Sequence, residues 1–161
     1  MAVASDGTAH IVYRDADAGS LRYVRRGADG VWTQPMVLDD QGDVGYFPQI
    51  RLDAERRPHI VHSVARTVDG LSGVRYLVAN SATPELGDFR SRAVSVRRQA
   101  DNQAPGLAGL PGPGRACLHI TNSGRALVGF YRADQRWLYL ARGDVDGGQG
   151  APSSKKVGIS R

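Results

Sequence analysis

Short apolar runs separated by polar turns follow one another along the chain. The runs are rich in Val, Ile, Leu and Tyr, and turns such as Asp-Gly, Asn-Ser-Gly and Asp-Ala-Gly lie between them. This pattern predicts β-strands, because β-branched and aromatic residues favour strands whereas Gly, Asp and Asn favour turns. The expected strands cover residues 2–4, 9–14, 21–26 and 32–38, then 48–53, 58–64, 74–79 and 89–96, and finally 116–121, 126–131, 137–142 and 155–159.

The strands recur in three similar units. His-Ile-Val occurs at residues 10–12 and again at 59–61, each time followed by a second apolar strand. A third and weaker copy begins near residue 116. The alignment equates Gly7 with Arg56 and Gly124, His10 with His59 and Leu127, and Leu21-Arg22-Tyr23 with Val74-Arg75-Tyr76 and Trp137-Leu138-Tyr139.

Four strands per unit, repeated at a spacing of about 45–50 residues, predict the blades of a β-propeller. Runs such as "HIVYR" and "VRYLV" carry apolar residues on both faces, which suits a sheet covered on both sides. A β-sandwich is the alternative, and it explains the strands but not their recurrence. We expect one all-β, propeller-like domain over residues 1–161, with blades at 1–40, 46–97 and 116–161 and a Pro- and Gly-rich insertion at 98–115.

Three blades do not close a ring, since propellers use four to eight. The sequence leaves three solutions open. A missing segment of a longer protein completes the propeller, two copies close a six-bladed ring, or the fold is a smaller β structure without a propeller.

Composition narrows the classes of partner. The net charge is +5, but the arginines are spread among aspartates and form no aromatic-interleaved basic patch, so we expect no nucleic-acid partner. No apolar run approaches the ~18 residues of a membrane helix, so we expect no membrane partner. The N-terminus shows no signal-peptide pattern, and Cys117 is the only cysteine. We expect no cofactor and no metal site.

The candidate ligand-binding residues follow from topology. In an antiparallel meander, the loops between second and third strands share one end with the connections between blades. Loops on a rigid scaffold commonly carry function, and Arg, Asp and Tyr side chains suit a polar ligand. The candidates at this end are Arg14, Asp15, Asp17, Asp43, Tyr46, Arg66, Asp69 and Arg132.

The series "DGTAHIVYRD", "LRYVRRGADGVW" and "DVGYFPQIRLD" resembles bacterial sialidase-like propeller repeats of the Asp-box-related (BNR) type. "GADGVW" at residues 27–32 is similar to a degenerate Asp-box. The resemblance implies that Asp29 caps the hairpin backbone and that Trp32 packs between blades, with Gly30 completing the turn. It also implies an extracellular bacterial parent protein, and it raises a carboxylate clamp made by Arg14, Arg66 and Arg132.

Two readings of function remain open. The first is a non-catalytic binding or scaffold module for carbohydrate or protein, with no catalytic residue. The second is a sialidase-like or other glycan-active hydrolase, which needs two placed carboxylates or a Tyr–carboxylate pair. His10 and His59 occupy equivalent places in successive units, so we expect them to lie apart and to satisfy backbone groups rather than to share a metal.

Overall fold

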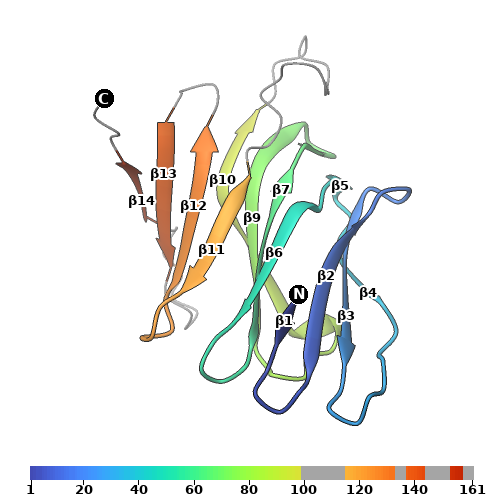
Figure 1. Ribbon diagram of the computed structural model, residues 1–161. Helices are drawn as coiled ribbons and strands as arrows, with labels where there is room; N and C mark the ends of the chain where they lie inside the picture. Colours follow the sequence, from blue (N-terminus) through green and yellow to red (C-terminus); the bar gives the residue numbers. More distant parts are fainter. Residues whose placement is uncertain (99–114, 133–136, 144–152, 158–161) are drawn as a thin grey trace.

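The computed structural model of the chain describes residues 1–98, 115–132, 137–143 and 153–157. These residues form three four-stranded antiparallel sheets, whose strands lie side by side in chain order (Figure 1). The all-β class and the four-stranded antiparallel units predicted from the sequence are therefore confirmed. The predicted Pro- and Gly-rich insertion lies, apart from its two end residues, outside the described residues.

Each predicted strand overlaps a strand of the structure. The N-terminal sheet contains β1 (Ala2–Val3), β2 (Ala9–Asp15), β3 (Ser20–Arg26) and β4 (Met36–Asp39). The central sheet contains β6 (Tyr46–Leu52), β7 (Pro58–Val64), β9 (Leu71–Ala79) and β10 (Phe89–Arg98). The C-terminal sheet contains β11 (Ala116–Ile120), β12 (Ala126–Arg132), β13 (Trp137–Gly143) and β14 (Ser153–Val157). The shorter elements are the strand pair β5 (Gly42–Asp43) and β8 (Arg66–Thr67), and the 3-10 turn η1 (Leu86–Asp88).

The repeat is visible in the turn between the first two strands of each sheet. The first residue of the turn accepts a hydrogen bond from the amide three residues later and donates one to the carbonyl four residues later. The third residue after the start has positive φ in every sheet, at +88° for Gly7, +64° for Arg56 and +73° for Gly124. The sequence alignment equated these three residues, so the three turns have one backbone conformation, which Gly adopts without strain and Arg does not.

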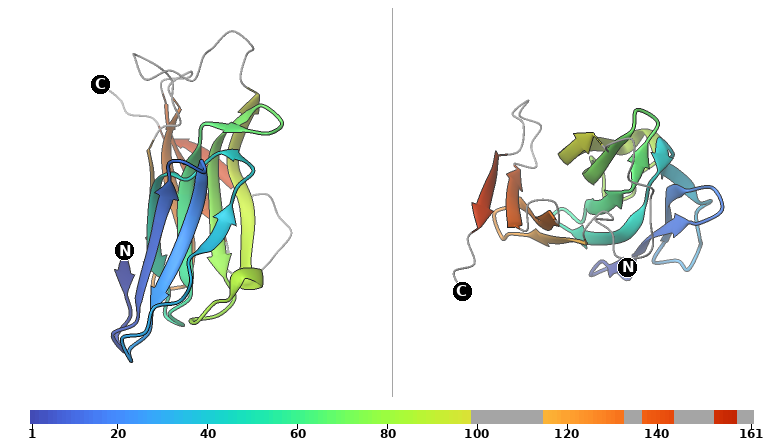
Figure 2. Two further views of the ribbon diagram at one scale, coloured as in Figure 1. Left: turned by 90° about the vertical axis from the view of Figure 1, so that its right-hand side faces the viewer. Right: turned by 90° about the horizontal axis from the view of Figure 1, so that it is seen from above.

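The central sheet is covered on both faces, and this is why all seven residues of β7 are buried. One face packs Ile50, Ile60 and Leu77 against the N-terminal sheet. The other face packs Val61, Val74 and Tyr76 against the C-terminal sheet. The first strands β1 and β11 both lie beside β6, and from there the three sheets fan out without closing a ring (Figure 2).

The third copy differs from the sequence alignment by one residue. The β12–β13 register pairs Leu127 with Arg142 and Gly129 with Leu140, as His10 pairs with Arg25 and Val12 with Tyr23. Leu140 therefore occupies the place of Tyr23 and Tyr76, and the alignment of Tyr139 with them is wrong. A one-residue shift moves a side chain to the other face of the sheet, so Tyr139 packs against the buried Phe130 on the side of the central sheet.

Two roles were expected for the Asp-box-like turn, capping of the hairpin by Asp29 and packing of Trp32 between blades, and only the first is found. Asp29 Oδ1 accepts a hydrogen bond from the Val31 amide at 3.0 Å, and Gly30 has φ +86°, as expected for a capped turn. Trp32, however, is 52% exposed, so the expectation that it packs between blades is wrong. Trp32 pairs only through an isolated bridge with Arg26, and regular pairing resumes after Pro35, which has no amide hydrogen to donate.

In the part of the chain that the structure describes, no helix is long and apolar enough to cross a membrane.

Candidate functional site

The loops that carry the candidate residues meet at one end of the sheets, the upper end in Figure 1. Arg14 and Asp15 end β2, Asp17 lies in the β2–β3 turn, and Asp43 lies in β5. Tyr46 begins β6, Arg66 begins β8, Asp69 lies in the β8–β9 turn and Arg132 ends β12. The placement of the loops follows from the meander topology. The Arg132 side chain lies outside the described part of the structure.

Three of the candidates form a compact cluster. Arg14 Nη2 donates to Asp43 Oδ1 at 2.8 Å, and the Tyr46 hydroxyl donates to Asp43 Oδ2 at 2.9 Å. The Arg14 guanidinium also lies over the Tyr46 ring, 4.2 Å from its centroid, as in a cation–π contact. Both carboxylate oxygens of Asp43 therefore have a partner, and the two long side chains that hold it fix each other in place.

Backbone contacts fix the position of this cluster. Arg14 Nε donates to the Val44 carbonyl at 3.1 Å, and the Val44 amide donates to the Gly19 carbonyl at 3.0 Å. The segment between the first two sheets is thus held against the β2–β3 turn. On its other side, β5 pairs with β8, which sets Asp43 opposite Arg66. Arg66 is exposed beside the cluster.

Two further residues at this end were not identified from the sequence. Phe47 is 46% exposed although it is a large aromatic residue, and its φ is +48°. Left-handed backbone is a true outlier for a bulky residue, and such strain persists where the surroundings impose it, commonly at functional sites. The Arg115 guanidinium lies 4.9 Å from the Phe47 ring centroid, and Phe47 lies next to Tyr46 with ring centroids 6.3 Å apart. We call Arg14, Asp43, Tyr46, Phe47 and Arg115 the loop-end cluster.

The sequence contained only part of the information needed to identify Phe47 as a candidate site residue. The pair Tyr46-Phe47 before Pro48 interrupts the polar connection between two repeats, and this is an unusual place for two aromatic residues. The strained backbone follows from an irregularity between Tyr46 and Gln49 in the β6–β7 register, which no sequence pattern specified.

Other candidates are not brought into the cluster. Asp15 follows Arg14 directly, but successive side chains of a strand point to opposite faces. Asp15 therefore pairs with Arg22 at 2.8 Å on the outer face of the N-terminal sheet. Asp17 and Asp69 lie in exposed turns. Of the three arginines of the expected carboxylate clamp, Arg14 contacts Asp43, the Val44 carbonyl and the Tyr46 ring, and the clamp stays a prediction.

The electrostatics of Tyr46 favour its protonated form. Partial burial raises the pKa of its hydroxyl, and the hydrogen bond to the negative Asp43 raises it further. The Arg14 charge opposes this, but the net pKa lies above that of a free tyrosine. At neutral pH the Tyr46 hydroxyl is therefore a hydrogen-bond donor and not a phenolate.

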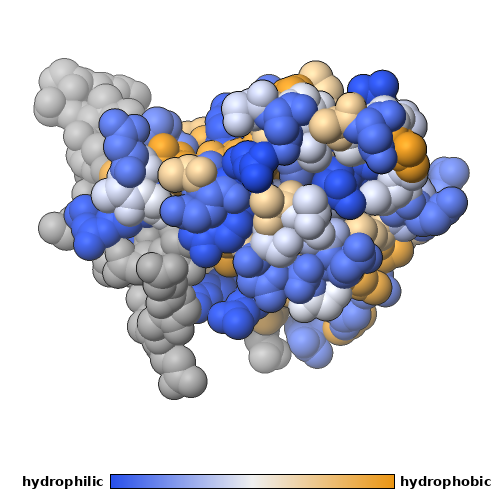
Figure 3. All heavy atoms as spheres, turned by 90° about the horizontal axis from the view of Figure 1, so that it is seen from below, coloured by the Kyte–Doolittle hydropathy of each residue, from blue (hydrophilic) through white to orange (hydrophobic). Residues whose placement is uncertain are grey.

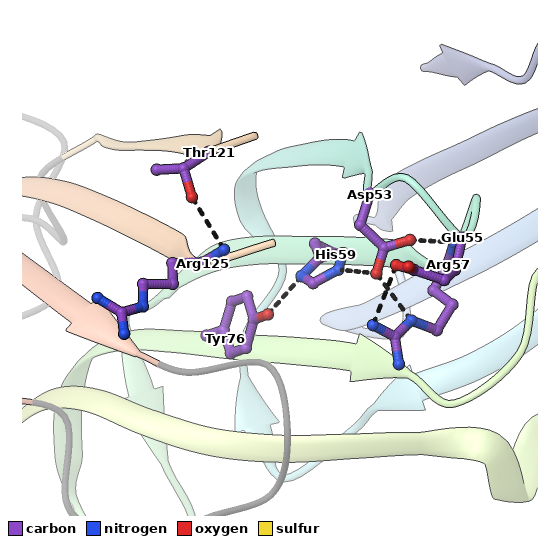
Figure 4. A network of polar contacts seen from close by, with 7 residues as sticks. All are labelled: Asp53, Glu55, Arg57, His59, Tyr76, Thr121 and Arg125. Carbon is purple, nitrogen blue, oxygen red and sulfur yellow. Dashed lines mark hydrogen bonds and ion pairs between the residues drawn. The ribbon is translucent and has the colours of Figure 1, made fainter. Parts of the chain in front are cut away.

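A second polar constellation lies in the core of the central sheet (Figure 4). His59 Nε2 lies 3.0 Å from Asp53 Oδ2, and His59 Nδ1 lies 2.5 Å from the Tyr76 hydroxyl. Asp53 Oδ2 also accepts a hydrogen bond from Arg57 Nε at 2.7 Å. Because an ionised carboxylate only accepts hydrogen bonds, His59 donates one to Asp53 through Nε2 and accepts one from the Tyr76 hydroxyl at Nδ1.

This Asp–His–Tyr series resembles the order of donors in a catalytic triad, but its environment is that of a core. His59 is fully buried, and burial lowers its pKa despite the neighbouring Asp53. Burial likewise raises the pKa of Tyr76. The hydroxyl at the end of the series packs among apolar side chains between the central and C-terminal sheets, so a substrate has no access to it. We assign the series to folding.

The N-terminal sheet repeats half of this arrangement. His10 Nδ1 lies 2.7 Å from the Tyr23 hydroxyl, in the same diagonal positions of β2 and β3. His10 and His59 thus lie in different sheets, as expected from the repeat. The expectation that they satisfy backbone groups is wrong, because each has a tyrosine hydroxyl as its partner. The signal was in the alignment itself, since Tyr recurs with His in both copies.

A third buried group joins two sheets. Asp39, which ends β4, accepts two hydrogen bonds from Arg75 Nη1 at 2.8 and 2.6 Å and lies 3.2 Å from His62 Nε2. Burial alone would raise the pKa of Asp39, but the contacts with His62, Arg75 and the Gln41 amide outweigh it and lower the pKa to about 2. The Gly45 amide donates to His62 Nδ1 at 3.2 Å, so this group also anchors the segment that leads to Tyr46.

The opposite end of the sheets has a different character. It is formed by the repeated turns at residues 4–8, 53–57 and 121–125 and by the Asp-box-like turn. Viewed from that side, its surface is mostly hydrophilic (Figure 3). Among the described residues, no group of three or more His, Cys, Asp and Glu side chains could hold a metal ion. The loop-end cluster is therefore the best candidate site in the described chain.

No known protein-family model matches the chain, and a search of curated proteins finds no significant match.

Proposed function

We propose that the three sheets are successive blades of a sialidase-like, Asp-box-related β-propeller, and that the chain is a binding module for carbohydrate. The glycan contacts the loop-end cluster, and the chain performs no chemistry on it. The repeated turn, the repeated His–Tyr pair and the uniform stacking of the sheets support the propeller.

The observation that carries the binding proposal is the exposed ring of Phe47 on a strained backbone. An exposed aromatic ring offers an apolar surface on which a sugar ring can stack, and polar groups around it can orient the sugar hydroxyls. Phe47 is exposed and held in a strained conformation beside Tyr46, with Arg66 and Arg115 at the same end. A strained, exposed aromatic residue contributes little to the core, so its conformation is better explained by recognition.

A glycan-active hydrolase is the second candidate, and one observation favours it. Tyr46 and Asp43 form a Tyr–carboxylate pair at 2.9 Å, which is the kind of pair that a tyrosine nucleophile requires. The raised pKa of Tyr46 weighs against this role, because a nucleophilic tyrosine must lose its proton readily. The binding module therefore remains the preferred function.

The experiment is a glycan array probed with the purified chain, followed by calorimetry on the bound glycans. We expect Phe47→Ala to weaken binding at least tenfold. The matched control is Val31→Ala, which removes an exposed apolar side chain at the opposite end and should leave the affinity unchanged. Binding of no glycan, or equal effects of the two substitutions, would overturn the proposal.

The same glycans separate binding from hydrolysis. Incubation with the chain followed by chromatography should return each glycan intact. Release of a sugar that Tyr46→Phe abolishes would establish the hydrolase instead. Binding of a protein without any glycan would move the module to the scaffold class.

A further inference from the structure

Each sheet has two faces, and the two faces of the central sheet pack on different sheets. We call the face that packs on the preceding sheet the backward face, and the face that packs on the following sheet the forward face. In the central sheet the backward face carries Ile50, Ile60 and Leu77, and the forward face carries Val61, Val74 and Tyr76.

The strand registers transfer these definitions to the other two sheets. The forward face of the N-terminal sheet carries Val12, Leu21 and Tyr23, which pack on the central sheet. The backward face of the C-terminal sheet carries Leu118, Val128 and Ala141, which also pack on the central sheet. Both internal interfaces therefore join a forward face to a backward face in the same way.

Among the described residues, no sheet packs on the forward face of the C-terminal sheet. Tyr131, Leu138 and Leu140 are 47%, 37% and 40% exposed. By register, they stand in the places of Ser63, Val74 and Tyr76, which are all buried in the central sheet. An exposed cluster of large apolar residues on a described strand pair indicates an interaction surface.

In the described part of the chain, the backward face of the N-terminal sheet has no sheet packed on it either. Ile11 and Val24 pair across β2 and β3, as the buried Ile60 and Leu77 pair in the central sheet, but they are only half-buried. Val3 on the same face is exposed. The Arg22 charge on this face is already paired with Asp15, so covering the face would not leave that guanidinium without a partner.

We propose that a second copy of this chain supplies the missing sheets. The backward face of one copy's N-terminal sheet packs on the forward face of the other copy's C-terminal sheet. This is a head-to-tail contact, and two copies that make it reciprocally bury all four open faces. The contact continues the internal interface, since it joins the same two kinds of face.

The composition of the open forward face fits this contact. The central sheet has the polar pair His59 and Tyr76 on its forward face, whereas the C-terminal sheet has Leu127 and Leu140 in these places. Covering these two leucines with Ile11 and Val24 removes apolar surface from water, and none of these four side chains carries a polar atom that would need a partner. Self-association requires no ligand at the loop-end cluster. Failure of the dimer proposal would therefore leave the proposed glycan binding untouched, and failure of glycan binding would leave the dimer proposal untouched.

The test measures the mass of the full chain in solution by light scattering, against 17.3 kDa for one copy. We expect twice that mass. Leu140→Asp alters the forward face and Val24→Asp the backward face, and each alone should raise the dimer dissociation constant at least tenfold. The control Val68→Asp places the same charge on an exposed turn outside both faces and should leave the dimer intact.

Mixing the two face variants identifies the contact as head-to-tail. The Leu140→Asp copy retains its backward face and the Val24→Asp copy its forward face, so the mixture should form dimers that neither variant forms alone. Circular dichroism of each variant establishes that it is folded. A monomeric wild type, a dimer that both substitutions leave intact, or a mixture that stays monomeric would overturn the proposal.

Discussion

His10 and His59 occupy equivalent positions in two sheets, yet their second ring nitrogens have different surroundings. His59 Nε2 faces Asp53, whereas the residue in the place of Asp53 in the N-terminal sheet is Ala4. His10 Nε2 is buried and has no hydrogen-bond partner among the described residues. Burial, assisted by the charge of Arg25, lowers the pKa of His10 to about 4. His10 is therefore neutral in the folded protein at neutral pH.

This difference predicts a pH dependence of stability. In the unfolded chain His10 binds a proton near pH 6.5, but in the folded chain it does so only near pH 4. As the pH falls through this window, protonation stabilises the unfolded state, and folding loses up to about 3 kcal/mol. The double substitution His10→Leu/Tyr23→Leu introduces the residues of the C-terminal sheet and should remove this loss. Urea unfolding at pH 7, 5.5 and 4.5 measures the free energy of unfolding of both proteins. An equal loss of stability with falling pH in the wild type and the double variant would contradict the low pKa of His10.

Arg56 provides a second test at the residue scale. It is the one member of the repeated turn that is not Gly and has positive φ, and it forms an ion pair with Asp6. Arg56→Gly and Arg56→Ala both remove this ion pair, but only Gly adopts the left-handed backbone without strain. We expect the Gly variant to be more stable than the Ala variant by about 1 kcal/mol in the free energy of unfolding. Equal stability would mean that the turn does not have this conformation in solution.

At the scale of elements, the sequence predicted the positions of the strands better than it predicted which face of the sheet each side chain occupies. Val, Ile and Tyr between Gly- and Asp-rich turns located all three meanders, because local propensity and turn chemistry agree there. The third copy failed by one residue, since "WLYL" offers apolar residues at successive positions and so does not specify which of them faces the core. Phe47 and the β5–β8 pair depend on contacts between distant segments, and a local pattern does not contain them.

Gly42 tests the β5–β8 pair. Its φ is +116°, and a Cβ there would collide with the Arg66 carbonyl oxygen and the Thr67 backbone. Gly70 has φ +73°, but a Cβ there would meet no atom within 4 Å. Gly42→Ala should therefore destabilise the protein by about 2 kcal/mol more than Gly70→Ala, because only the first adds a steric collision to backbone strain. Thermal and urea unfolding of both variants measure the difference, and similar losses would show that β5 and β8 are not closely paired.

At the scale of the whole molecule, Asp39 links two sheets. It belongs to the N-terminal sheet, whereas its partners His62 and Arg75 belong to the central sheet. Asp39→Ala leaves Arg75 without its carboxylate and should cost about 3 kcal/mol of stability. The neighbouring Asp40 is exposed, so Asp40→Ala should cost less than about 0.5 kcal/mol. Similar effects of the two substitutions would exclude a buried tie between the sheets.

The stability that Asp39 contributes through these contacts depends on pH. Because the folded pKa of Asp39, about 2, lies below the unfolded value of 3.8, its contribution is fully present above about pH 4. It is lost as the pH falls from about 4 to about 2, which is below the window of His10. The wild type should therefore lose stability in both windows. In an acid titration followed by circular dichroism, Asp39→Ala should lose less stability than the wild type in the more acidic window.

The most direct test of the proposed function is a titration of the isotopically labelled chain with a bound glycan, followed by nuclear magnetic resonance. We expect the shifted amides to cluster at residues 43–47, 66–70 and 115, around the exposed ring of Phe47. Amides of the opposite turns, at residues 4–8, 27–31 and 53–57, should not move. Shifts confined to those turns, or no shifts with any glycan, would contradict a carbohydrate site at the loop-end cluster.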